Sequence, residues 1–321
     1  MNPPKISIVV PVLNEAANLR LVLPGLPDVH EIILVDGGSV DHTIETAQQV
    51  RPEIKILQQT RRGKGNALVC GFEAATGDII VMFDADGSAD PQEIPRFVDA
   101  LVKGADYAKG TRFCKTDTGR AGSDDISLIR MAGNAGLNAV ANLLFRTRFS
   151  DLCYGYNAFW RGILPLLHLP PVAASDIKPD QLLWGDGFEI EAVLSCRVAA
   201  AHLRVTEVPS LERCRIHGAS NLRTFSDGTR VLRTLVNERV RARHLRRAAR
   251  PALAGRPAAS RSGLEPPSDL LTTTPSSYGG ERQTGRVHLS PLRSSTGGAP
   301  RALARGKSQP CAGYEDVRND S

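Results

Sequence analysis

The first hundred or so residues alternate between short apolar runs and segments with helical spacing, and this alternation limits the possible folds more than any other feature. The apolar runs lie at residues 5–12, 31–35, 54–57 and 79–83. A helical pattern of apolar residues follows each of them. Strands that alternate with helices build a parallel sheet covered by helices on both faces, with ligands at the carboxyl ends of the strands. The sequence therefore predicts an α/β fold with a doubly wound, mostly parallel sheet.

The later residues carry sparser patterns. Residues 112–125 are polar and contain glycine, which predicts a loop, and the aromatic stretch at 151–161 either lines a pocket or fills the core. The other patterns predict strands at 107–111 and 203–208 and helices at 126–145, 187–197 and 227–240. The helix at 126–145 is amphipathic with arginines near its ends, so it either covers the core or lies on a membrane surface.

The composition changes after about residue 250. Proline, serine, glycine, threonine and arginine become frequent there and the apolar periodicity ends, which is typical of disordered segments. We therefore predict a folded domain at residues 1–245 and a disordered low-complexity tail at residues 246–321.

Charge and cysteine content narrow the functional classes. The net charge is +6, but much of the excess comes from an arginine-rich run at 239–250. Such a run is more typical of a solvated helix end that leads into a disordered tail than of binding to anionic lipid or nucleic acid. The six cysteines show no C-x-x-C spacing, which argues against a zinc site and a disulfide framework and favours the cytoplasm. We find no signal segment and no apolar stretch of about 18 residues. We expect a soluble protein, or one that is peripheral at the cytoplasmic face of a membrane.

Asp84 and Asp86 directly follow the fourth apolar run. Alternate residues of an extended chain point to the same side, so these carboxylates lean together and repel each other. A hard divalent cation relieves the repulsion, and Mg²⁺ favours one or two protein carboxylates together with substrate phosphates. The pair therefore predicts a metal and diphosphate site. An alternative is a solvated turn in which Asp90 caps the next helix and Pro91 begins it.

Polar side chains follow two other predicted strands. Asn14 and Glu15 come after the first strand, where Asn14 can cap the following helix, and Asp36 ends the second. Because the carboxyl ends of parallel strands meet at one edge of a sheet, we expect these residues to lie near the aspartate pair. A basic, glycine-rich loop at 61–65 opens the third predicted helix.

Four segments of this region resemble family 2 glycosyltransferases with the GT-A fold. They are IVVPVLNE at 8–15, VDGGSVDHT at 35–43, RRGKGNA at 61–67 and FDADGSADP at 83–91. Later segments are similar to the polyprenyl-phosphate (dolichyl-phosphate) mannose and glucose synthases, namely DLCYGYNAFWR at 151–161, GFEIEAVL at 187–194 and RIHGASNL at 215–222.

The resemblance covers residues 5–240 and implies a GT-A fold, in which helices flank a Rossmann-like, mostly parallel sheet. It divides the predicted domain into a nucleotide-sugar-binding half at 1–112 and an acceptor half at 113–245. In the family, the nucleotide is held by a Pro-x-x-Asn-Glu segment, an aspartate after the second strand and a basic residue of the glycine-rich loop. The corresponding residues here are Pro11, Asn14, Glu15, Asp36 and Lys64. The resemblance implies that Asp36 accepts a hydrogen bond from the base.

The implied metal is Mg²⁺ or Mn²⁺. Asp84 is expected near the ribose and the metal, and Asp86 is expected to bind the metal directly. His217 is a candidate third ligand because a histidine is neutral enough at pH 7 to bind a metal. A loop histidine without such a role is an equally open interpretation.

The acceptor half carries the implied phosphate contacts. Arg130, in the predicted helix at 126–145, is the candidate for an acceptor phosphate. The family's G-x-S-K-L motif appears at 218–222, with Ser220 among the expected donor-binding residues and Asn221 in place of the lysine. The phosphate contact of that lysine is therefore missing, and Arg213 or Arg215 is a candidate substitute.

The implied reaction is an inverting transfer of a hexose from a nucleotide sugar of the UDP-glucose or GDP-mannose type. A polyprenyl phosphate, the favoured acceptor, is largely ionised at neutral pH and needs arginine contacts rather than a base. A saccharide or another hydroxyl acceptor needs a carboxylate base, for which Asp186, Glu189 and Glu191 are candidates. Glu189 and Glu191 are two residues apart on a predicted helix, so we expect only one of them to face the site.

Two other classes are disfavoured. A phosphohydrolase could use the aspartate pair as its nucleophile, but such enzymes usually place the pair after the first strand rather than the fourth. A nucleotide-sugar-binding module without catalytic activity is also disfavoured, because the motifs that resemble the family are intact.

Overall fold

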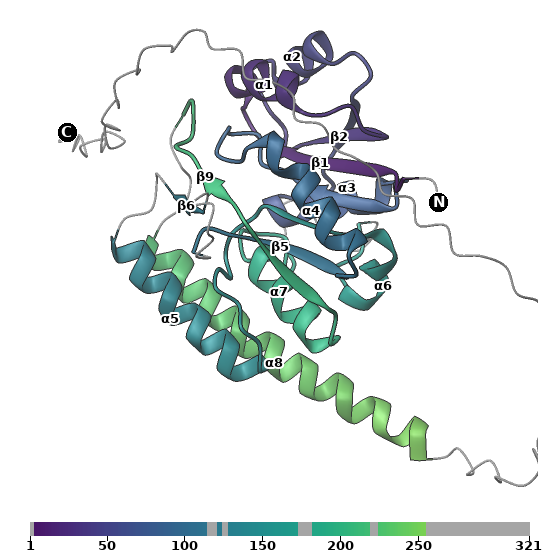
Figure 1. Cartoon of the computed structure of the whole chain (residues 1–321), viewed down its shortest axis with the longest axis vertical. Coiled ribbons are helices and arrows are strands. Elements are labelled where there is room, and N and C mark those ends of the chain that lie inside the picture. The colour runs from purple at the N-terminus through teal and green to yellow at the C-terminus, as the bar shows by residue number, and fades with distance from the viewer. Residues whose placement is uncertain (1–2, 114–120, 124–127, 173–181, 219–223, 255–321) are drawn as a thin grey trace, which may run out of the picture. The chain divides into compact units, whose positions relative to one another are not determined.

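The computed structural model describes residues 3–113, 121–123, 128–172, 182–218 and 224–254. Within them, a seven-stranded sheet has the order β3-β2-β1-β4-β7-β5-β8 (Figure 1). The strands are β1 (Ile6–Val12), β2 (Glu31–Asp36), β3 (Lys55–Gln58), β4 (Ile79–Met82), β5 (Tyr107–Thr111), β7 (Asn157–Trp160) and β8 (Val205–Pro209). All neighbours are parallel except β7, which is antiparallel to β4 and β5. A short parallel pair joins β6 (Gly122–Ser123) to β9 (Leu211–Glu212).

Helices cover both faces of the sheet. They are α1 (Ala16–Val22), α2 (Thr43–Val50), α3 (Lys64–Ala74), α4 (Ile94–Val102), α5 (Leu128–Phe145), α6 (Leu164–Leu167), α7 (Ile190–Ala200) and α8 (Thr224–Ala254), with 3₁₀ turns at Leu23–Gly25, Pro91–Glu93 and Arg161–Ile163. Successive strand residues point to opposite faces. On β1, Ile8 and Val10 therefore join the core with α1, α2 and α4, whereas Val9 joins the core with α3, α6 and α7.

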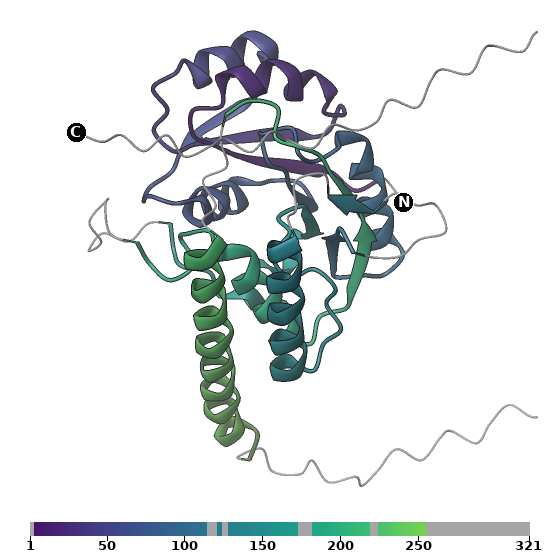
Figure 2. The ribbon, with the colours of Figure 1, turned by 90° about the vertical axis from the view of Figure 1, so that its left-hand side faces the viewer.

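A third cluster joins α5 and α8 to the outer side of α7. Ala141, Cys196 and Leu235 belong to it. Helices α5 and α8 run alongside each other there, beyond α7 (Figures 1 and 2). The predicted α/β architecture is confirmed. The strand expected at 107–111 is present with the same bounds, and the elements expected after it are present with shifted ends.

Strand β7 was not predicted. It lies within the aromatic stretch and inserts between β4 and β5. Aromatic residues of the stretch fill both cores, with Tyr156, just before β7, on one side of the sheet and Phe159, within β7, on the other. Tyr154 also lines the pocket described below, so the two expectations for this stretch are both met.

Two other expectations need correction. Helix α8 continues to Ala254, so residues 246–254 are helical rather than part of a tail; the predicted tail at 255–321 lies outside the described residues. Cys70, Cys153 and Cys196 are free thiols, but Cys214 is disulfide-bonded, contrary to the expectation from cysteine spacing. In the described part of the chain, no helix is both long and apolar enough to span a bilayer.

Candidate active site

A pocket of about 1220 Å³ lies at the carboxyl ends of the first four strands. Its walls come from the end of β1, the turn after β2, the end of β3 and the turn after β4, and from α5, α7 and α8 on the other side. The carboxyl ends of these strands therefore come together at one edge of the sheet, as predicted. The pocket brings together five of the predicted site residues at these ends, which are Pro11, Glu15, Lys64, Asp84 and Asp86.

Lys64 links the two walls of the pocket. Its Nζ lies 2.9 Å from a carboxylate oxygen of Asp84 and 2.9 Å from Oε1 of Glu191. Burial alone would lower the pKa of Lys64, but the two carboxylates outweigh burial and raise the pKa above its usual value. Lys64 is therefore charged at neutral pH. Gly155 packs closely against these charged groups, because an added Cβ at this position would lie 3.2 Å from Oδ2 of Asp84.

The loop before α3 needs glycine at positions 63 and 65 because the backbone around Asp186 lies too close to leave room for a side chain. Gly63 has φ of +118°, and an added Cβ would lie 2.1 Å from the Asp186 carbonyl oxygen. A Cβ on Gly65 would lie 1.9 Å from the Gly185 carbonyl oxygen. The Gly65 amide donates to the Asp186 carbonyl at 2.7 Å. The Asn66 amide donates to the same carbonyl at 3.2 Å, so these two amides of the first turn of α3 are satisfied by the protein itself.

The Asp186 side chain is fully buried and does not line the pocket. Its carboxylate accepts from Nε of Arg61 at 2.8 Å, from Nη2 of Arg61 at 3.0 Å and from the Leu183 amide at 2.9 Å. These hydrogen bonds raise the pKa of Arg61. The candidate base Asp186 is thus placed as a structural ion pair, away from the pocket surface.

The aspartate pair is neutralised by two separate cations. Asp84 contacts Lys64, and Oδ2 of Asp86 lies 3.4 Å from Nη1 of Arg215, which also pairs with Glu15. The other oxygen of Asp86 accepts from the amide and the hydroxyl of Ser88 at 3.0 and 2.7 Å. The alternative helix-capping interpretation also holds, because the Asp90 side chain accepts from the Gln92 amide at the turn that precedes α4.

The donor set at Asp84 and Asp86 fits a hard divalent cation. Both carboxylates line the pocket, and Mg²⁺ needs only one or two of them when phosphates and water complete its shell. His217 does not join them: it is exposed, it does not line the pocket, and its backbone bonds to Asn18. Among the described residues, no three His, Cys, Asp or Glu side chains form a metal-binding group.

Asn14 and Asp36 shape the pocket from behind rather than lining it. Asp36 is buried, and its Oδ2 accepts from the Gly38 amide at 2.9 Å and from Nε2 of Gln58 at 3.0 Å. Asn14 has φ of +56° and accepts from the Val40 amide at 2.9 Å, so it braces a loop instead of capping α1. Both residues hold the turn that carries Gly38 into the pocket wall.

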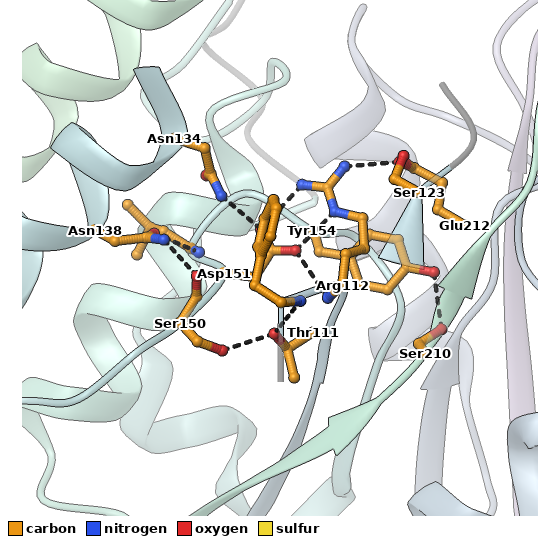
Figure 3. Close-up of polar contacts among 12 residues, drawn as sticks. Thr111, Arg112, Ser123, Asn134, Asn138, Ser150, Asp151, Tyr154, Ser210 and Glu212 are labelled. Carbon is orange, nitrogen blue, oxygen red and sulfur yellow. Dashed lines mark hydrogen bonds and ion pairs between the residues drawn. The ribbon is translucent and has the colours of Figure 1, made fainter. Parts of the chain in front are cut away.

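Arg112, which the sequence analysis left in a loop, is central to the opposite wall (Figure 3). Its guanidinium binds Asp151 through Nε at 2.7 Å and Nη2 at 2.9 Å, and Glu212 through Nη1 at 2.9 Å. It also lies 4.9 Å from the ring centre of Tyr154. Burial would lower the pKa of Arg112, but Asp151 and Glu212 outweigh it and raise the pKa. Arg112 directly follows β5, so the same strand-end rule could have identified it.

Comparison with known proteins decides the family. The family described as Glycosyl transferase family 2 matches residues 7–164. Residues 7–164 of the chain therefore belong to glycosyltransferase family 2.

Several relatives of this family 2 glycosyltransferase are named after lipid phosphates. Dolichol-phosphate mannosyltransferase of Pyrococcus furiosus is 34% identical over 119 residues, which cover 35% of this chain and 34% of the relative. Undecaprenyl-phosphate 4-deoxy-4-formamido-L-arabinose transferase of Yersinia enterocolitica is 36% identical over 126 residues, covering 36% and 38%. Glycosyltransferase AglJ of Haloferax volcanii is 26% identical over 230 residues, covering 70% and 69%. The match to the mannosyltransferase thus spans about a third of its length.

Solved structures show the same fold. Glucosyl-3-phosphoglycerate synthase of Mycobacterium tuberculosis, crystallised with Mn²⁺, UDP-glucose and phosphoglyceric acid, aligns with a TM-score of 0.54 at 24% identity. The alignment covers 74% of this chain and 80% of that one. This family 2 glycosyltransferase therefore has the expected GT-A fold.

The remaining candidates of this family 2 chain lie at residues 113–245, the half that the sequence analysis expects to bind the acceptor. Glu189 and Glu191 both line the pocket, so the expectation that only one faces it is wrong. The reason is local: α7 begins at Ile190, and Glu189 precedes the helix. Arg130 lies in the first turn of α5, and Ser220 lies outside the described residues.

Proposed function

We propose that this chain transfers a hexose from a nucleotide sugar to a polyprenyl phosphate, with inversion at the anomeric carbon and with Mg²⁺ or Mn²⁺ at Asp84 and Asp86. The observation that carries the proposal is the pocket itself. The aspartate pair, Lys64 and Arg215 face it from the strand ends, and Arg112 faces it from the other wall. Relatives named for dolichol phosphate and undecaprenyl phosphate support the acceptor class.

The donor occupies the strand-end wall in this proposal. Pro11, Gly38 and Gln58 line the part of the pocket where the base and ribose would lie. Lys64 and Arg215 present fixed positive charge beside the aspartate pair. A bound divalent cation would neutralise the charge that grows on the leaving diphosphate. The protein groups orient the donor so that its sugar points toward Arg112.

The acceptor approaches from the other wall. A phosphate monoester is largely dianionic at neutral pH, because its second pKa is about 6, so its oxygen attacks without a base. Arg112 is held rigidly by Asp151 and Glu212 and can orient such an anion. Arg130 stays a proposed second contact. Attack from the face opposite the leaving diphosphate gives inversion.

A second candidate acceptor is a hydroxyl group. Glu189 lines the pocket, and its buried Oε2 has no hydrogen-bond partner among the residues that the structure describes. That oxygen lies 4.0 Å from a guanidinium nitrogen of Arg230. An unoccupied carboxylate oxygen in a pocket wall suits a general base, and Glu191 is less suited because Lys64 engages it.

One assay separates these functions. The full chain is incubated with UDP-glucose or GDP-mannose, Mn²⁺, and either a polyprenyl phosphate or a panel of saccharide acceptors. We expect labelled lipid product, and we expect Asp86→Ala to abolish it. Product with hydroxyl acceptors alone would replace the lipid proposal with the second candidate. Nucleotide binding without turnover on any acceptor would indicate a binding module.

The proposal includes a peripheral contact with a membrane, because a polyprenyl acceptor resides in one. A cytoplasmic location remains a prediction.

A further inference from the structure

The outer side of α5 is apolar along its length. Met131, Ala135, Ala139 and Leu143 are spaced four apart and are all exposed, so they form one stripe along the helix. Leu143 is 81% exposed and Met131 is 41% exposed. From Met131 to Phe145 the sequence contains no charged residue.

Helix α8 carries a matching stripe. Leu232, Val236 and Val240 are also spaced four apart and are 44%, 51% and 46% exposed. The opposite side of α8 packs into the core through Val231 and Leu235. We call the two stripes together the α5–α8 face.

Arginines border the α5–α8 face. Arg233, Arg243 and Arg246 on α8 are exposed, as is Arg146 at the end of α5. The pKa of the nearby Arg239 is lowered by burial and by repulsion from Arg243, Arg246 and Arg146, so these guanidinium groups are crowded together. Within the described residues, no ion pair involves Arg146, Arg233 or Arg243.

Acidic groups do not balance this charge. Between residues 228 and 246 the sequence has a single acid, Glu238. Glu238 is buried and pairs with Arg197 at 2.8 Å. The exposed surface of α8 is therefore apolar and basic.

We propose that the α5–α8 face docks on an anionic lipid bilayer. Apolar stripes with an arginine border match the interfacial zone of such a bilayer, where apolar side chains enter the acyl boundary and basic ones meet anionic headgroups. A second copy of the chain fits less well, because a symmetric contact would bring the arginine borders together. The same two helices line the pocket through Asn134, Leu137, Arg230 and Val231, so docking places the pocket wall beside the membrane.

The proposed lipid acceptor is the reason that the chain would need to bind a membrane, so this inference rests on the proposed function. Its test measures vesicle binding and needs no enzymatic turnover. The full chain is sedimented with vesicles of phosphatidylcholine alone and with increasing phosphatidylglycerol, at low and at high salt. We expect binding that rises with phosphatidylglycerol and falls with salt, because arginine attraction is screened. The double variant Val236→Glu with Val240→Glu is expected to reduce partitioning by roughly tenfold or more.

Val102→Glu is the matched control, because Val102 is a 58% exposed helical valine on α4, away from the α5–α8 face. We expect it to bind vesicles like the unaltered chain. Equal loss in both variants, or no vesicle binding by the unaltered chain, overturns the proposal. A dimer in solution that only the α8 variant dissociates, without vesicle binding, would instead make the face a contact between copies.

Turnover of a short, water-soluble prenyl phosphate without vesicles separates docking from chemistry. The α8 variant is expected to keep this turnover, since neither valine lines the pocket. If no acceptor is glycosylated but the vesicle results hold, the proposed function fails and the docking surface stands.

Discussion

Asp186→Asn is expected to lower the stability of this protein rather than to remove a catalytic base. The substitution removes the charge from a carboxylate that is fully buried and bound twice by Arg61, whose side chain is only 3% exposed. Removing one partner of a buried ion pair costs about 3–5 kcal/mol, because the other charge stays buried without compensation. For a domain of this size, 1 kcal/mol corresponds to about 2–4 °C in Tm, so we expect Tm to fall by roughly 6–20 °C.

The measurement is thermal unfolding followed by circular dichroism, together with sugar transfer at a temperature where both proteins are folded. Glu189→Gln serves as the matched control. Its Oε1 accepts from the Gly185 amide at 3.1 Å, and an amide oxygen can still do so, which should keep the change within about 1 kcal/mol. An Asp186→Asn protein with unchanged Tm and no transfer would refute the structural assignment and restore Asp186 as a base.

A rescue variant makes the test independent of stability. Arg61→Met combined with Asp186→Leu removes both buried charges, and such replacements are often neutral or stabilising. We expect the double variant to recover most of the lost Tm. Because Asp186 touches no reacting group in this assignment, measurable transfer should also return. A stable but inactive double variant would contradict it, provided that nucleotide binding is kept.

Further predictions concern single residues whose surroundings are unusual. Lys109 is fully buried, and among the described residues its Nζ contacts only the Tyr154 carbonyl, at 3.4 Å. Lys109→Met should therefore raise the free energy of unfolding, measured in urea, by about 1–3 kcal/mol. The Tyr154 carbonyl would still accept a hydrogen bond from Asn157. Burial lowers the pKa of Lys109 although Asp151 acts in the opposite direction. Between the pKa of the folded state and that of the unfolded state, the folded chain binds fewer protons, so the free energy of unfolding rises with pH. The stability advantage of Lys109→Met should therefore shrink as the pH approaches 10.5, the usual pKa of lysine. Gly65→Ala should cost at least about 2 kcal/mol, because its Cβ would overlap a carbonyl. Gly136→Ala, with open space around it in α5, should instead stabilise by about 0.5–1 kcal/mol.

The strand-end wall of the pocket was predictable because its residues follow strands. Parallel strands bring their carboxyl ends to one edge, so Glu15, Lys64 and the aspartate pair could be placed together without knowing any contact. The same rule could not show that Asp36 and Asn14 would turn inward. Their orientation depends on amides in the turn that follows β2, whose positions are set only when β1 and β2 pair.

The site residues from the second half of the chain were less predictable because they meet the first half through long-range contacts. Arg215 joins Glu15 and Asp86 across 200 and 129 residues of sequence, and no local pattern encodes such a pairing. Glu191 was misjudged because α7 starts one residue after Glu189, so helical spacing does not apply to the pair. Strand β7 was missed because it is four residues long and runs against its neighbours.

The charge balance of the pocket gives a physical reason for a metal in the proposed reaction. Among the described residues, seven basic and six acidic side chains line it. Three of the basic ones are already paired with carboxylates outside the lining, namely Arg61 with Asp186, Arg112 with Asp151, and Arg213 with Asp90. The lining therefore offers a donor diphosphate no excess positive charge of its own. A divalent cation at the aspartate pair would supply that charge where the diphosphate leaves, and Lys64 and Arg215 would then be free to turn from the aspartates toward the phosphates.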